Sequence, residues 1–104
     1  MKFGLADHTI ENIQQVFSGF NEIEEVILYG SRAKGNYKEG SDIDLTIKGK
    51  VINKDFLNRL QIQLDQLYLP YTFDISCFED LSNESLIDHI KRVGVSFYQK
   101  KNKE

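Results

Sequence analysis

Several residue types are scarce in this chain of 104 residues, and each scarcity excludes certain kinds of protein. It has one cysteine, one proline and no tryptophan. Cys77 cannot form an internal disulfide and has no second cysteine for a CxxC or zinc pattern, so we expect a small core residue there. The longest apolar run, 26–29, is far shorter than the roughly 20 residues of a membrane span, and no apolar segment suited to a signal peptide follows Lys2. We therefore expect a cytoplasmic protein that does not enter the membrane.

An excess of positive charge is also absent. The formal net charge is −3, whereas binding to long nucleic acid depends on neutralising many phosphates at once. The charge is unevenly distributed, however, because residues 30–50 hold five Lys or Arg and three Asp or Glu. This local excess suits a small anion and is too weak to follow a duplex.

The apolar spacing predicts three helices. The first has Ile10, Ile13, Phe17 and Phe20 on one face, with Asp7 or Thr9 as its N-cap. The second occupies 53–67 with Asn53 as its cap. The third begins at an N-cap on Ser82 and continues to about Tyr98, which leaves a frayed polar tail at 98–104.

Three strands are predicted between these helices, at 24–30, 41–49 and 71–76. The resulting order of helices and strands indicates a single domain over residues 1–104 of α/β (α+β) class, with a small mixed sheet flanked by helices. Because a helix joins the second and third strands, we expect these two strands to be parallel.

Two carboxylates stand two residues apart in the second strand. Asp42 and Asp44 leave the same face of that strand, where their like charges repel unless a cation lies between them. Oxygen ligands without His or Cys favour Mg²⁺ or Mn²⁺. Asp74 occupies the polar face of the third strand, so adjacent strands would bring three carboxylates together. Such a trio can hold two ions about 3.5–4 Å apart and serve phosphoryl chemistry.

A glycine and a serine end the first strand upstream of these carboxylates. Gly30 lets the backbone approach a ligand closely, and the Ser31 hydroxyl and nearby N–H groups can bind phosphate oxygens. Arg32 and Lys34 add positive charge in the same turn. Together these residues predict a triphosphate site facing a metal site.

Simpler interpretations exist for each part of this pattern. A Gly-Ser pair alone is usually a turn, and an Asp-x-Asp pair is often a solvated strand edge or hairpin. Both at this spacing should arise by chance in roughly one in a thousand chains of this length. A Walker motif is excluded because Asn36-Tyr37 replaces Lys-Ser/Thr after Gly35, and a calcium loop is excluded by Ile47 and Asn53 at its sixth and twelfth positions.

The remaining polar and aromatic candidates carry less information. His8 and His89 have no partner at zinc-ligand spacing, so we expect them to be incidental surface or half-buried side chains. The five tyrosines are expected in the core or at its rim, although Tyr37 in the loop could stack on a nucleobase.

The segment "GSRAKGNYKEGSDIDL", followed by a later Asp, resembles the signature of the nucleotidyltransferase superfamily that includes DNA polymerase beta, in its minimal stand-alone form. This resemblance implies that Gly30 and Ser31 bind the nucleoside triphosphate, that Asp42 and Asp44 hold Mg²⁺, and that Asp74 is the third carboxylate. It also implies attack of a hydroxyl on the α-phosphorus of ATP, with pyrophosphate leaving. Lys34 stands where many relatives carry Arg, which keeps the charge but loses the bidentate fork.

The short chain resembles the MntA-type antitoxins that pair with helical HEPN proteins. The resemblance implies a complex with a HEPN-type partner and transfer of AMP to a tyrosine of that partner, which is a protein adenylyltransferase activity. Two alternatives remain open. The protein could neutralise its partner by binding alone, or it could transfer a nucleotide to a small molecule or an RNA end.

Overall fold

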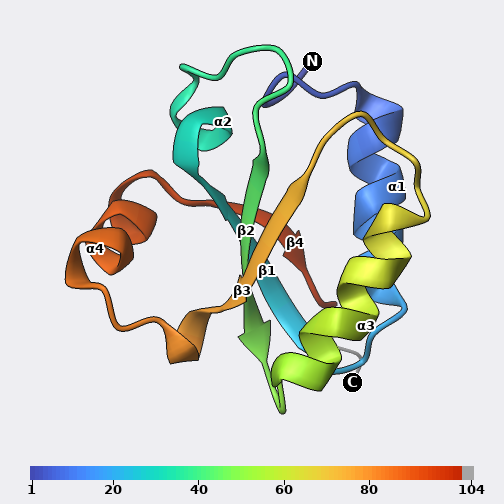
Figure 1. Cartoon of the computed structure of the whole chain (residues 1–104), viewed down its shortest axis with the longest axis vertical. Coiled ribbons are helices and arrows are strands. Elements are labelled where there is room, and N and C mark those ends of the chain that lie inside the picture. The colour runs from blue at the N-terminus through green and yellow to red at the C-terminus, as the bar shows by residue number, and fades with distance from the viewer. Residues whose placement is uncertain (102–104) are drawn as a thin grey trace.

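The computed structural model describes residues 1–101. Within this range the secondary-structure elements follow one another along the chain as shown in Figure 1. They are α1 (Asp7–Ser18), β1 (Ile23–Tyr29), α2 (Gly30–Lys34), β2 (Ile43–Gly49), α3 (Lys54–Asp65), β3 (Phe73–Cys77), a 3₁₀ turn (Phe78–Asp80), α4 (Glu84–Val93) and β4 (Val95–Gln99).

The strands form one mixed sheet in the order β3-β2-β1-β4. Strand β1 is antiparallel to both β2 and β4, whereas β2 and β3 are parallel and are joined by α3. The predicted mixed sheet and its parallel pair are therefore confirmed. Figure 1 shows α1 and α3 on one side of the sheet and α2 and α4 on the other.

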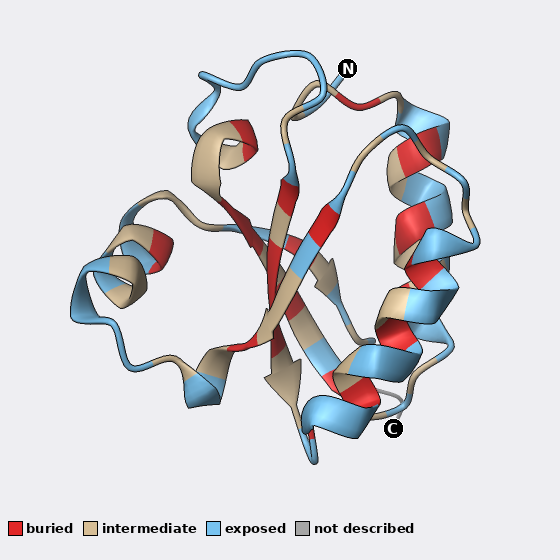
Figure 2. Ribbon diagram, viewed as in Figure 1, coloured by how far each residue is buried: buried red, intermediate tan, exposed pale blue. Residues whose placement is uncertain are grey.

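The hydrophobic core lies between the sheet and the pair α1 and α3, where the inward faces of both helices are buried (Figure 2). Alternation along the strands explains why one face is apolar, because every second side chain of a strand points to the same side. The fully buried core includes Ile13, Phe17, Leu60 and Leu64 from the helices and Val26, Leu28, Ile43, Leu45 and Ile47 from the strands. Cys77 is buried here too, as expected.

The last helix is shorter than predicted, and the expectation that it reaches Tyr98 is wrong. It ends at Val93, and residues Val95–Gln99 form β4 beside β1. Phe97 continues the helical spacing of apolar residues in the sequence, but in the structure it packs edge-on against Phe17 at 6.3 Å between ring centroids. Pairing with an existing strand edge thus overrides the helical pattern. The predicted tail therefore begins inside a strand, and its residues 102–104 lie outside the described part of the chain.

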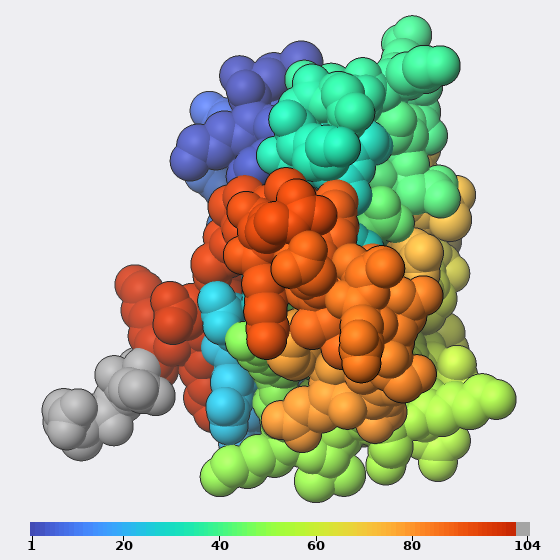
Figure 3. Space-filling view, turned by 90° about the vertical axis from the view of Figure 1, so that its left-hand side faces the viewer, coloured from blue at the N-terminus to red at the C-terminus, as the bar shows by residue number. Residues whose placement is uncertain are grey.

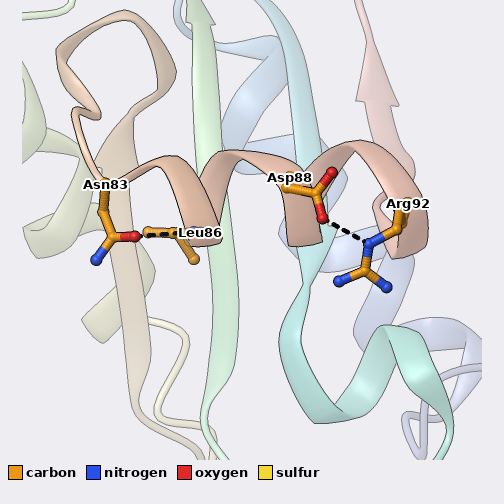
Figure 4. Close-up of polar contacts among 4 residues, drawn as sticks. All are labelled: Asn83, Leu86, Asp88 and Arg92. Carbon is orange, nitrogen blue, oxygen red and sulfur yellow. Dashed lines mark hydrogen bonds and ion pairs between the residues drawn. The ribbon is translucent and has the colours of Figure 1, made fainter.

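The helix caps agree only partly with prediction. Asn53 caps α3 as expected, because its side chain accepts a hydrogen bond from the Phe56 N–H at 2.9 Å. In α4 the cap is Asn83 rather than Ser82, and its side chain accepts from the Leu86 N–H at 3.0 Å (Figure 4). Helix α1 begins at Asp7 without a side-chain cap. No helix formed by residues 1–101 is long and apolar enough to cross a membrane.

Candidate active site

Three polar side chains occupy one rung across three neighbouring strands. Tyr29 of β1 is paired with Asp44 of β2, and Asp44 is paired with Asp74 of β3. Residues opposite one another on adjacent strands project to the same face of a sheet. Because Ile43 and Leu45 point into the core, this rung points to the other side, toward α2 and α4. The prediction that the strand of Asp44 and the strand of Asp74 are neighbours is therefore confirmed.

The carboxylates on this face influence one another. The pKa of Asp44 is raised to about 6, mainly because the carboxyl is partly removed from water, and further because Asp74 and Asp42 are negatively charged nearby. Arg32 acts in the opposite direction. Asp42 itself is exposed and lies just before β2. The folded chain thus holds several like charges on one face, and a bound cation would relieve their repulsion.

The donor chemistry of this face suits a hard divalent cation, although the protein does not enclose one. Among residues 1–101, no three His, Cys, Asp or Glu side chains form a group that could hold a metal ion, so the predicted trio of Asp42, Asp44 and Asp74 does not come together as one metal-binding group. Mg²⁺ commonly takes only one or two protein carboxylates and completes its shell with water and substrate phosphates. The carboxylates present therefore fit a site that a nucleotide would help to complete.

Gly30 brings the turn after β1 directly against Asp44. Its φ of +76° is a conformation that L side chains rarely adopt. A Cβ added at Gly30 would collide with the Asp44 carboxylate, with Cγ only 3.2 Å away. Both requirements select glycine here. Ser31 follows within the short helix α2 and is half-buried. The structure therefore brings the predicted phosphate turn next to a predicted metal ligand.

His89 of α4 contacts this turn, which the sequence pattern did not reveal. Its Nε2 accepts a hydrogen bond from the Gly30 N–H at 3.0 Å, and its ring packs edge-on against Tyr29 at 6.2 Å between centroids. The side chain is half-buried, as expected, but its contact with the Gly30 turn was not expected. Its spacing from Leu86, three residues earlier on the inward face of α4, was the available signal.

Tyr29 is buried beside the same carboxylates. Loss of solvent raises the pKa of its hydroxyl above the ordinary value, and the charges of Asp74 and Asp44 raise it further, while a hydrogen bond with Ser76 acts against them. Tyr29 therefore remains neutral near neutral pH and forms one wall of the site.

Arg32 occupies a different environment from the one predicted. Its side chain is only 2% exposed. Its Nε and Nη2 donate to the carbonyl oxygen of Ser41 at 3.0 and 2.8 Å, and its Nη1 donates to the carbonyl oxygen of Phe3 at 2.8 Å. The guanidinium also lies over the rings of Tyr71 and Tyr37, at 4.7 and 5.4 Å. These contacts hold the loop after α2 against the N-terminal segment, and direct binding of nucleotide by Arg32 stays a prediction.

Lys34 lies at the C-terminal end of α2 and is exposed. Helix α2 ends at Lys34, and the left-handed φ of +93° at the following Gly35 turns the chain into the loop that leads to Asp42. Figure 3 shows the side of the molecule that carries α2 and α4, with α4 at the centre of the view and α2 above it.

Two cavities lie away from the carboxylates. One of about 1030 Å³ lies between α1 and β4 and includes Gln14, Ser18 and Phe97. Another of about 590 Å³ is lined in part by Arg32, Tyr37 and Tyr71. We place the candidate site on the carboxylate face because charge and backbone geometry, rather than volume, identify it.

The fold and this site together define a small nucleotidyl-transfer domain. The sequence profile described as "Polymerase beta, Nucleotidyltransferase" matches residues 11–103. The chain therefore belongs to the polymerase beta nucleotidyltransferase family, and it is a nucleotidyltransferase. No curated protein matches the chain in sequence.

Solved structures share the fold at low sequence identity. A chain from the crystal structure of a toxin-antitoxin with AMP-PNP superimposes with a TM-score of 0.69 and 16% identity, over 93% of this chain and 76% of the other. A chain from the structure of a tri-AMPylated Shewanella oneidensis HEPN toxin in complex with MNT antitoxin gives a TM-score of 0.66 and 14% identity, over 89% and 71%. A chain from the toxin-antitoxin MntA-HpeT mutant D39ED41E gives 0.66 and 13%, over 93% and 75%.

Proposed function

We propose that this protein transfers AMP from ATP to a hydroxyl group, and that the acceptor is a tyrosine of a HEPN-type partner. The observation that carries the proposal is the close approach of the Gly30 turn to Asp44, on a sheet face where Asp44 lies opposite Asp74. This arrangement brings a backbone suited to phosphates next to carboxylates suited to a cation.

The predicted site residues other than Arg32 each have a role in this proposal. Gly30 and Ser31 bind the triphosphate, and Lys34 adds a positive charge that attracts it. Asp42, Asp44 and Asp74 would hold Mg²⁺ or Mn²⁺, with two ions in the site that the nucleotide completes. The bound cation supplies charge neutralisation for the phosphates and the leaving group.

The reaction is an in-line displacement at the α-phosphorus. The oxygen of the acceptor hydroxyl forms a bond to this phosphorus, the bond to the β-phosphate oxygen breaks, and pyrophosphate leaves. Asp74 accepts the hydroxyl proton. Because exposed Asp74 lies opposite half-buried Asp44, it is the more accessible carboxylate of this pair to an acceptor from outside.

The similar structures support a HEPN-type partner. One of them pairs a tri-AMPylated HEPN toxin with an MNT antitoxin, and another includes AMP-PNP. The net charge of −3 gives no support to a long nucleic acid as acceptor. We place the reaction in the cytoplasm, where ATP and a HEPN-type partner would meet.

The test is transfer of label from ATP labelled at the α-phosphate to a purified HEPN-type partner in the presence of Mg²⁺. We expect label on the partner, loss of that label when its acceptor tyrosine becomes Phe, and loss with Asp42→Ala/Asp44→Ala. The matched control is Asp88→Ala, which removes an exposed carboxylate of α4 outside the proposed site.

Two results would favour the alternatives. Unlabelled partner that is nevertheless neutralised by the double variant would indicate neutralisation by binding alone. Label that appears on RNA ends or small molecules without any partner would indicate a different acceptor.

A further inference from the structure

The hydrogen bond between His89 and Gly30 joins two parts of the chain that lie 59 residues apart. Gly30 begins the proposed phosphate turn, whereas His89 belongs to α4, which begins at Glu84, after the strand β3 that contains Asp74 and the 3₁₀ turn that follows this strand. Nothing in the proposed chemistry requires α4. The proposed chemistry therefore does not account for the hydrogen bond between His89 and Gly30.

The Gly30 turn is fixed from two directions. On one side its Cα lies so close to the Asp44 carboxylate that an added Cβ would force the carboxylate to shift. On another side its N–H is bound by His89 Nε2 at 3.0 Å. Since Nε2 accepts this hydrogen bond, the neutral ring carries its proton on Nδ1. A loss of the acceptor would free the turn to move relative to Asp44.

The His89 ring is itself held in place. It packs edge-on against Tyr29, the residue before Gly30, with an interplanar angle of 80°. Helix α4 is anchored by Ile90, which is buried, and by the Asn83 cap. The nitrogen that binds Gly30 is therefore presented by a packed helix rather than by a flexible loop.

We propose that His89 is a positioning residue for nucleotide binding, which holds the Gly30 turn at the distance from Asp44 that a metal-bound triphosphate requires. The inference rests on the proposed nucleotide site. It implies that α4 influences ATP affinity through the Gly30 turn, although no residue of α4 needs to touch the nucleotide.

Three variants separate hydrogen bonding from packing. His89→Phe keeps an aromatic ring beside Tyr29 but removes the acceptor. His89→Gln removes the ring and retains an oxygen that can accept from the Gly30 N–H. Ser85→Ala changes an exposed residue one turn earlier in α4 without altering charge and serves as the control.

Two measurements are needed, one without nucleotide and one with it. Amide hydrogen exchange of Gly30, followed by NMR, reports the hydrogen bond in the free protein. Calorimetric titration with a non-hydrolysable ATP analogue and Mg²⁺ reports affinity, and steady-state kinetics with the partner separate KM from kcat. We expect faster Gly30 exchange and about tenfold weaker binding in His89→Phe, with KM affected more than kcat. Affinity should be largely restored in His89→Gln and unchanged in Ser85→Ala.

The outcomes distinguish this inference from the function on which it rests. If the wild type binds the analogue and His89→Phe binds it equally well, the inference is overturned while the proposed function survives. The same holds if His89→Gln is as weak as His89→Phe, because a retained acceptor would then not restore binding. If the wild type binds no analogue with Mg²⁺, the proposed function and this inference fail together.

Discussion

Asp44 and Asp74 lie directly opposite each other on the parallel strands β2 and β3, on the sheet face turned away from the core. Two carboxylates in this position repel each other when ionised, so the fold gains no stability from them unless a cation is bound. The pair therefore makes the free protein less stable, and a bound cation would offset this loss; both effects can be measured.

Asp44→Asn should stabilise the free protein at neutral pH. The folded state raises the pKa of Asp44 from 3.8 to about 6, so it binds a proton more readily than the unfolded state, and stability falls as pH rises through this interval. Because the side chain is only partly buried, screening by solvent reduces the effect to on the order of 1 kcal/mol. We expect this gain in the free energy of unfolding at pH 7.5 in urea with EDTA, and little gain at pH 4.

The control for this measurement is Glu11→Gln, on the exposed face of α1. It should change the free energy of unfolding by less than about 0.5 kcal/mol at either pH. Destabilisation of Asp44→Asn at pH 7.5 would contradict the argument, and so would an equal gain at both pH values.

Gly30→Ala should be more harmful than Gly35→Ala. Both glycines have positive φ, so both substitutions incur a backbone cost of about 1–2 kcal/mol. Only at Gly30 does the new Cβ meet the Asp44 carboxylate, whereas at Gly35 no atom lies within 4 Å. Urea unfolding should show an additional loss for Gly30→Ala.

A double-mutant cycle checks the cause of that loss. In an Asp44→Ala background the colliding carboxylate is absent, so Gly30→Ala and Gly35→Ala should become similar in cost. If the excess cost of Gly30→Ala persists there, the collision is not its origin.

Arg32→Lys should destabilise the protein in the absence of any nucleotide. The shorter, single-headed ammonium cannot reproduce the bonds from one guanidinium to the carbonyl oxygens of Phe3 and Ser41. Leaving buried acceptors unpaired costs about 1–3 kcal/mol each, so we expect a loss of about 2–4 kcal/mol by urea unfolding.

Lys34→Gln provides the contrast to Arg32. Because Lys34 is exposed, its substitution should change stability by less than about 0.5 kcal/mol while weakening binding of an ATP analogue. Equal stability of Arg32→Lys and the wild type would show that the buried contacts of Arg32 contribute little to the free energy of unfolding. Phosphate binding would then be the remaining predicted role of Arg32.

Divalent cations should stabilise the wild type more than Asp42→Asn/Asp44→Asn. Binding to the folded state alone adds RT ln(1 + [L]/Kd), which is about 1.4 kcal/mol at ten times Kd. Thermal unfolding with MgCl₂, compared with NaCl of equal ionic strength to account for screening, measures this difference. An identical shift in the wild type and the double variant would place the cation elsewhere.

The local pattern of the sequence determined most of the framework of this protein. Period-two alternation around Ile43 put Asp44 on a polar strand face, with Asp42 just before the strand, and helical spacing after Asn53 identified the connection that makes β2 and β3 parallel. These features depend on neighbours a few residues apart, which is the range over which such patterns carry information. The Gly-Ser turn could be predicted for the same reason, because its two residues are adjacent in the sequence.

Only the tertiary structure decided the rest. Residues after Val93 fit a helical spacing, yet they form β4 because the free edge of β1 offers backbone partners. The sequence predicts Arg32 as a phosphate ligand, which stays a prediction, and only the fold shows that its side chain is buried and donates to the carbonyl oxygen of Ser41 in the loop after α2. His89 meets Gly30 across 59 residues, and no local pattern encodes a hydrogen bond between segments brought together by packing. The sequence by itself thus determined which groups are available for chemistry, and the packing of α4 and of the loop after α2 decided which of them hold the site in place.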